Sequence, residues 1–100
     1  MTIKLVKHSP SSVELRLEGR LDTISSPAAQ ESLLQIAGEY ETIELNFSEL
    51  SYISSAGLRV LLMLQKQVNR TGGQLCLTNV KPAIMEVFEM TGFSGILYIR

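Results

Sequence analysis

Residues 52–62 of the chain read YISSAGLRVLL. An aromatic and a β-branched residue, which favour strands, precede two serines, a small residue, a glycine and an apolar run with helical spacing. The stretch therefore predicts a turn from a buried strand into a helix. Ser54 and Ser55 stand at this turn. Two interpretations are open: a serine caps the helix, or one of the pair carries a function.

The residues before this turn predict a hairpin, a helix and a third strand. Apolar residues alternate on both sides of HSPSS (8–12), which is typical of a β-hairpin covered on one face. Ser26 precedes Pro27, so a helix is expected to start there with Ser26 as its cap, and Gly38 ends it. TIELNF (42–47) alternates again and predicts a strand.

The residues after the turn predict a helix, a strand, a second helix and a last strand. The first helix is expected from about Ala56 to Arg70, with an apolar stripe, and Gly72–Gly73 ends it. QLCLTNV (74–80) predicts a strand too apolar to have a solvated face. Lys81–Pro82 opens the next helix, and GILYIR (95–100) predicts a final short strand.

The order of these elements predicts the fold class. It is strand, strand, helix, strand, helix, strand, helix, strand, within one domain over residues 1–100. Strands that alternate with helices pair in parallel through right-handed crossovers, whereas the leading hairpin is antiparallel. We therefore expect an α/β fold with a mixed β-sheet and helices packed mainly on one face.

Composition limits the kinds of partner and compartment. The chain has 100 residues and a formal net charge of -1, and its cations are scattered rather than massed as a nucleic-acid footprint. No apolar run approaches the ~20 residues that span a bilayer, and no signal peptide is recognisable. The lone Cys76 lies in an apolar run and is expected to be a small buried hydrophobe. These features predict a cytoplasmic protein.

The chain is poor in groups that perform catalysis. His8 is the one histidine and stands beside the expected hairpin turn, so a surface position is favoured over a catalytic base. No cluster of cysteine and histidine suits a metal, Asp22 is the one aspartate, and no phosphate-binding glycine loop occurs. The sequence therefore predicts a binding protein that is not an enzyme and needs no metal or cofactor.

The turn at Ser54 and Ser55 is the remaining place for a function. It follows the carboxyl end of a strand, where open α/β sheets meet ligands and partners. One serine accounts for a cap, and the second, followed by Ala56 and Gly57, predicts a small-residue surface that a partner can approach closely. A phosphoserine also suits the N-terminus of a helix, where free N–H groups partly compensate its charge.

Three stretches resemble one known family across nearly the whole chain. They are EGRLD (18–22), FSELSYISSAGLRVLL (47–62) and MEVFEMTGF (85–93), which together resemble STAS domains of the bacterial anti-sigma factor antagonists. When the motif is anchored on Gly57–Leu58, the resemblance makes Ser55 the phosphoacceptor, with Ser54 a less favoured one. The resemblance also assigns Asp22 to the partner-facing surface.

The resemblance implies a switch between partners. An unphosphorylated antagonist of this kind sequesters an anti-sigma factor, which is a serine kinase with the histidine-kinase-like ATPase fold. The kinase phosphorylates the serine and weakens the complex, and a serine phosphatase reverses the change. No nucleic acid and no direct membrane insertion are implied.

Two residues depart from the family pattern, and one helix extends the expected surface. Ser54 stands where the family often has aspartate, and Asn46 replaces an aspartate expected at the end of the third strand. Arg59 and Lys66 on the helix after the turn are candidate rim contacts. The expected partner-binding residues are Asp22, Ser54, Ser55, Ala56, Gly57 and Arg59.

Two other classes of function stay open at this point. One is a constitutive STAS subunit of a membrane lipid or anion transport assembly, in which Ser55 is idle. The other is an enzyme of unknown type, for which His8 is the testable residue.

Overall fold

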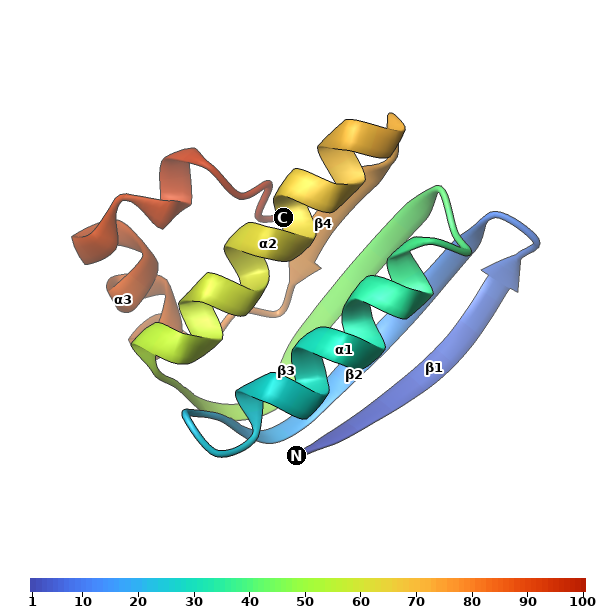
Figure 1. The fold of residues 1–100 in the computed structure, drawn as a ribbon. Helices are drawn as coiled ribbons and strands as arrows, with labels where there is room; N and C mark the ends of the chain where they lie inside the picture. Colours follow the sequence, from blue (N-terminus) through green and yellow to red (C-terminus); the bar gives the residue numbers. More distant parts are fainter.

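The computed structural model describes residues 1–100 (Figure 1). Its strands are β1 (Thr2–Ser9), β2 (Ser12–Leu21), β3 (Thr42–Ile53) and β4 (Gln74–Thr78). Its helices are α1 (Ser26–Ala37), α2 (Ser55–Thr71) and α3 (Pro82–Thr91), followed by the short 3₁₀ helix η1 (Phe93–Gly95). No helix is long and apolar enough to cross a membrane.

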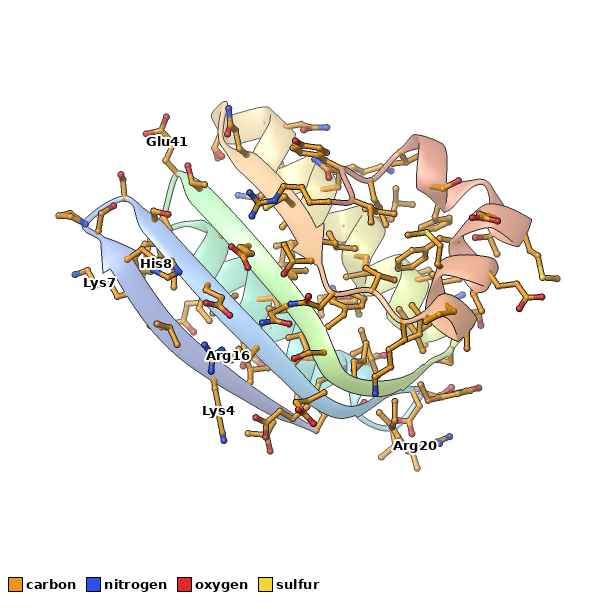
Figure 2. All side chains as sticks on the ribbon, turned by 180° about the vertical axis from the view of Figure 1, so that it is seen from behind. Lys4, Lys7, His8, Arg16, Arg20 and Glu41 are labelled. Carbon is orange, nitrogen blue, oxygen red and sulfur yellow. The ribbon has the colours of Figure 1, made fainter.

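The sheet is mixed, as the sequence predicts. Its order is β1-β2-β3-β4, with β1 antiparallel to β2 and the other two pairs parallel. Figure 1 shows α1 and α2 side by side over one face of the sheet, and the view from behind in Figure 2 shows the opposite face without a helix. The predicted α/β class and the order of the elements are confirmed.

The core lies between the sheet and its helices because the strand residues alternate. Leu15, Leu45 and Leu77 point to the helices from three neighbouring strands and are fully buried. Phe47 and Phe88 add an edge-to-face ring contact with centroids 6.2 Å apart. This packing fixes the carboxyl ends of β2 and β3 at one edge of the molecule, where α1 and α2 begin.

Two expected ends of elements are wrong. Asn46 does not end its strand, because pairing with β2 continues through two register shifts to the pair Leu21 and Ile53. Ser26 does not cap α1 with its hydroxyl: it is the first residue of that helix, and its Oγ donates to the carbonyl of Asp22. Ser25 occupies the cap position without a capping hydrogen bond.

The last predicted strand is present only as one bridge between Leu77 and Ile99. The 3₁₀ helix at Phe93–Gly95 coils the chain at Gly95, where the sequence predicts the last strand to begin. The N–H of Leu97 donates back to the carbonyl of Phe93. Two backbone hydrogen bonds, from Leu77 to Tyr98 and from Arg100 to Leu77, hold the segment at the sheet edge.

The prediction that residues 74–80 have no solvated face is wrong. Leu75 and Leu77 face the helices, whereas Cys76 and Thr78 lie half-buried on the face that no helix covers. Cys76 is therefore not a fully buried hydrophobe. Its partial burial still raises the pKa of the thiol.

The uncovered face carries a polar network centred on Glu14, and two of its members, His8 and Arg16, are labelled in Figure 2. Glu14 is only 7% exposed, and its carboxylate accepts from Asn46 Nδ2 and Arg16 Nε, each at 2.9 Å, with His8 Nε2 at 3.4 Å. The bond from Asn46 and then that from Arg16 hold the pKa of Glu14 below its usual value. The ionised carboxylate therefore stabilises the native protein.

A Glu14→Gln chain is expected to lose about 1 kcal/mol of unfolding free energy at pH 7, because hydrogen bonds to a charged group disappear. The folded pKa is depressed, so this contribution is complete above the unfolded pKa of about 4.3 and is lost as pH falls through the folded value. Urea unfolding followed by circular dichroism at pH 7 and pH 3 measures the difference. Glu18→Gln on the same strand is the control. If Glu14→Gln and the wild type differed in unfolding free energy as much at pH 3 as at pH 7, the stabilising role of the ionised Glu14 carboxylate would be contradicted.

Candidate functional site

The turn between β3 and α2 is built by Ser54. Its backbone is extended (φ -100°, ψ 177°), and its Oγ accepts from the N–H of Gly57 at 3.3 Å. The Ser54 carbonyl accepts from Leu58, and its N–H donates to the carbonyl of Leu21 at 3.0 Å. Ser54 is therefore the helix cap, and the capping interpretation is confirmed for this serine.

Ser55 stands in a different environment one residue later. It is the first residue of α2 and is exposed, and its hydroxyl makes no hydrogen bond within the chain. The first N–H groups of a helix lack carbonyl partners in the preceding turn, so the surroundings of this hydroxyl are electropositive. The fold does not use the Ser55 side chain.

Gly57 is buried, so the prediction that it offers surface to a partner is wrong. A Cβ at this position would lie 2.6 Å from the carbonyl oxygen of Leu21 and 2.8 Å from Cγ1 of Ile53. The glycine allows α2 to cross close to the end of β2. Ser55 and the half-buried Ala56 remain as the small-residue surface.

Asp22 holds the neighbouring loop between β2 and α1. Its Oδ1 accepts from the N–H groups of Ser25 at 3.0 Å and Ile24 at 3.1 Å, and Ser25 Oγ accepts in turn from the Asp22 N–H. The bond from the Ser25 N–H is the main reason that the pKa of Asp22 is lowered. Because the Asp22 carboxylate accepts these backbone N–H groups, it holds the loop in one conformation and fixes the position of Ile24.

Ile24 and Met63 are apolar residues of this region that sequence reasoning missed. Ile24 is 91% exposed at the tip of the Asp22 loop, and Met63 on α2 is 44% exposed. The isolated isoleucine in the polar stretch DTISS (22–26) was the available signal.

A groove separates the first turns of α1 and α2 beside Ser55. On the α1 side it is lined by Thr23, Ser26, Pro27 and Gln30, and on the α2 side by Ala56, Arg59, Val60 and Met63. The structure thus brings Ala56 and Arg59 together with the Asp22 loop, next to Ser55. Lys66 does not line the groove.

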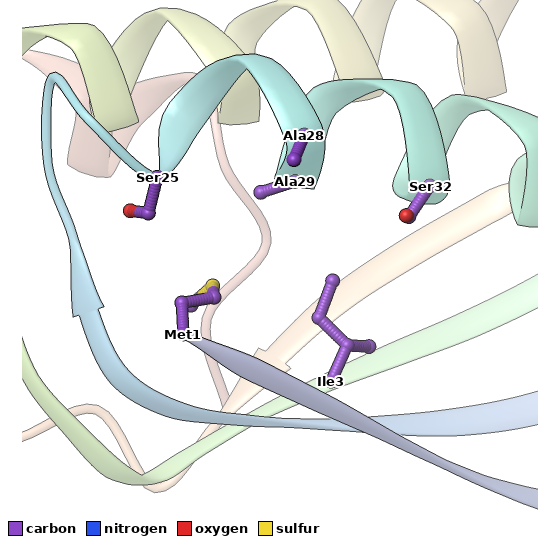
Figure 3. Close-up of a pocket in the computed structure, with 6 residues that line it drawn as sticks. All are labelled: Met1, Ile3, Ser25, Ala28, Ala29 and Ser32. Carbon is purple, nitrogen blue, oxygen red and sulfur yellow. The ribbon is translucent and has the colours of Figure 1, made fainter.

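A second hollow lies between α1 and the edge strand β1 (Figure 3). Ala28, Ala29 and Ser32 form its helical wall, and Met1 and Ile3 form its floor. No charged side chain lines it, in contrast to the groove that contains Arg59.

The sequence pattern of the STAS domain matches residues 4–100, which include both loops and all of the sheet except the first two residues of β1. The chain belongs to the STAS domain family. This confirms the resemblance seen in the EGRLD and YISSAGL stretches.

Curated STAS relatives carry the names of anti-sigma factor antagonists. The anti-sigma-B factor antagonist of Bacillus subtilis is 29% identical over 94 residues, which cover 94% of this chain and 86% of the relative. The anti-sigma F factor antagonist of Paenibacillus polymyxa is 27% identical over 96 residues, covering 94% and 82%.

Solved structures support the same STAS fold. The anti-sigma factor antagonist SpoIIAA in its unphosphorylated form, and the Bacillus protein in its phosphorylated form, each superpose with a TM-score of 0.77. Both are 24% identical to this chain, cover 99% of it, and are themselves covered over 87% and 91% of their lengths.

Proposed function

We propose that this STAS protein is an anti-sigma factor antagonist that is switched off by phosphorylation of Ser55. The observation that carries the proposal is the contrast at the turn: the Ser54 hydroxyl is used as a cap, whereas the Ser55 hydroxyl is exposed and unbonded. The names of the curated relatives support the partner class, and SpoIIAA is a relative of the same fold known in both phosphorylation states.

The proposed partner is an anti-sigma factor that is also a serine kinase of the histidine-kinase-like ATPase fold. Unphosphorylated, the chain sequesters it through Ser54, Ser55, Ala56 and Arg59, with the Asp22 loop beside them. The kinase transfers the γ-phosphoryl group of ATP: the Ser55 Oγ–P bond forms, the bond from γ-phosphorus to ADP breaks, and the hydroxyl proton is released. A serine phosphatase hydrolyses the ester and restores the binding form.

The switch works through charge on this surface. A phosphoserine adds about -1.5 to -2 charges at pH 7, where the unmodified turn offers a neutral hydroxyl. The start of α2 partly compensates that charge, so the helix keeps its position. A partner shaped to the neutral turn then meets a bulky, solvated anion, and the complex weakens.

The two serines allow a direct test of the proposal. The wild-type chain, Ser55→Ala and Ser54→Ala are each used to capture the partner from lysate of the native organism, with and without Mg²⁺-ATP, and mass spectrometry locates any phosphate. We expect phosphate on Ser55 in the wild type and in Ser54→Ala, none in Ser55→Ala, and release of the partner only where phosphate is found.

The same variants separate capping from signalling. Ser54→Ala is expected to lower the unfolding free energy by about 1 kcal/mol through loss of the cap, whereas Ser55→Ala leaves it nearly unchanged. A phosphate that persists on another residue of Ser55→Ala contradicts the assignment of Ser55.

A further inference from the structure

Arg59 is the one arginine of the chain that has no partner. The other four are engaged: Arg16 with Glu14 at 2.9 Å, Arg20 with Asp22 at 3.6 Å, Arg70 with Gln67, and Arg100 with Glu44 at 3.2 Å. Arg20 also lies over the ring of Tyr52, 4.1 Å from its centroid. The Arg59 guanidinium makes neither an ion pair nor a hydrogen bond in the unmodified protein.

No acidic residue lines the groove that contains Arg59. Arg59 is the only charged residue among those that line the groove, and the α1 wall contributes a threonine, a serine, a proline and a glutamine. Two acids flank the α1 wall in sequence: Asp22 is bonded within its own loop and paired with Arg20, and Glu31, next to Gln30, forms no ion pair with Arg59. The groove therefore carries one uncompensated positive charge.

Ser55 and Arg59 lie one turn apart on the same face of α2. Residues four apart are neighbours on the surface of a helix, with Cβ atoms about 5–6 Å apart. Long side chains lean toward the N-terminus of their helix and cover the preceding turn, which in α2 contains Ser55 and Ala56. Arg59 lines the groove together with Ala56. An anion that precedes a cation by four residues is also the favourable order for such a pair.

We propose that Arg59 is the built-in counter-ion for a phosphate on Ser55. This inference rests on the proposed phosphorylation of Ser55 and deepens it. The phosphate pairs with the Arg59 guanidinium one turn further along α2. The modification therefore adds an anion to the turn and neutralises the positive charge of Arg59, the only charged residue that lines the groove. One chemical event thus changes both halves of the partner-facing surface.

The test uses the full chain with phosphoserine incorporated at position 55 during translation, so that no kinase is needed. The second ionisation of the phosphate, about pH 6 for an isolated phosphoserine, is titrated by ³¹P NMR in the wild type, Arg59→Gln and Lys66→Gln. A nearby guanidinium favours the dianion, so Arg59→Gln is expected to raise this pKa by about 0.3 units. Lys66→Gln removes a cation from the same helix, outside the groove, and is expected to match the wild type.

A second signal follows the guanidinium itself. On phosphorylation, the Arg59 Nε–H resonance is expected to shift and sharpen in the wild type because its exchange with water slows. Equal phosphate pKa values in Arg59→Gln and Lys66→Gln, with an unshifted Arg59 resonance, would overturn the pairing. Failure of the proposed function is separate: it would appear as absence of phosphate on Ser55 in the lysate experiment, while the encoded phosphoserine still reports on the pair.

Discussion

Ser55→Asp is expected to weaken binding of the anti-sigma factor at least about tenfold, which corresponds to about 1.4 kcal/mol. The carboxylate places a hydrated charge at a surface where the wild type has a free hydroxyl, and burying it against the partner requires its desolvation. The fold itself should tolerate the change, because an acidic residue in the first turn of a helix is favourable.

Isothermal titration of the purified pair measures this loss. Ser32→Asp is the matched control, since Ser32 is an exposed helical serine that lines the hollow on the other side of α1. Undiminished affinity of Ser55→Asp would favour the alternative in which the domain is a constitutive subunit of a membrane lipid or anion transport assembly.

Gly57→Ala is expected to lower the unfolding free energy by about 2 kcal/mol. The added methyl would lie within 3 Å of three atoms of Leu21 and Ile53, one of them a backbone oxygen that cannot turn aside. Overpacking of this kind costs about 1–3 kcal/mol and occasionally more. The better helix propensity of alanine, worth up to about 1 kcal/mol, offsets only part of that cost.

Thermal and urea unfolding followed by circular dichroism test this prediction. Gly95→Ala is the control, because a Cβ there meets nothing within 4 Å and the residue does not have a positive φ. Equal stability of the two variants would contradict the close approach of α2 to β2. If α2 shifts to relieve the contact, the turn that we propose to face the partner moves with it, so Gly57→Ala should also reduce binding of the anti-sigma factor.

Much of the fold could be predicted because local signals agree with the tertiary structure. The alternating strands, the stop at Gly72 with φ 76° and the unequal environments of the two serines at the turn all follow from short-range chemistry. The same signals located the turn that the structure places beside the groove.

The errors occurred where a local pattern had more than one outcome or where the environment of a residue depends on distant parts of the chain. Ser26 has the sequence context of a cap, but the carbonyl of Asp22 takes its hydroxyl. Gly57 looked like exposed small surface, and only the crossing of α2 over Leu21 explains its burial. Cys76 sits in an apolar run, yet no helix covers its side of the sheet.

The carbonyl of Leu21 links the two loops of the proposed partner-facing surface. It accepts the N–H of Ser54 and lies against Gly57, while the next residue, Asp22, holds the loop that presents Ile24. Both loops are therefore pre-organised before any partner arrives, and association requires little loss of backbone entropy. On the proposed function, the rates of association and release should then depend on diffusional encounter and charge, and no loop has to fold when the partner binds.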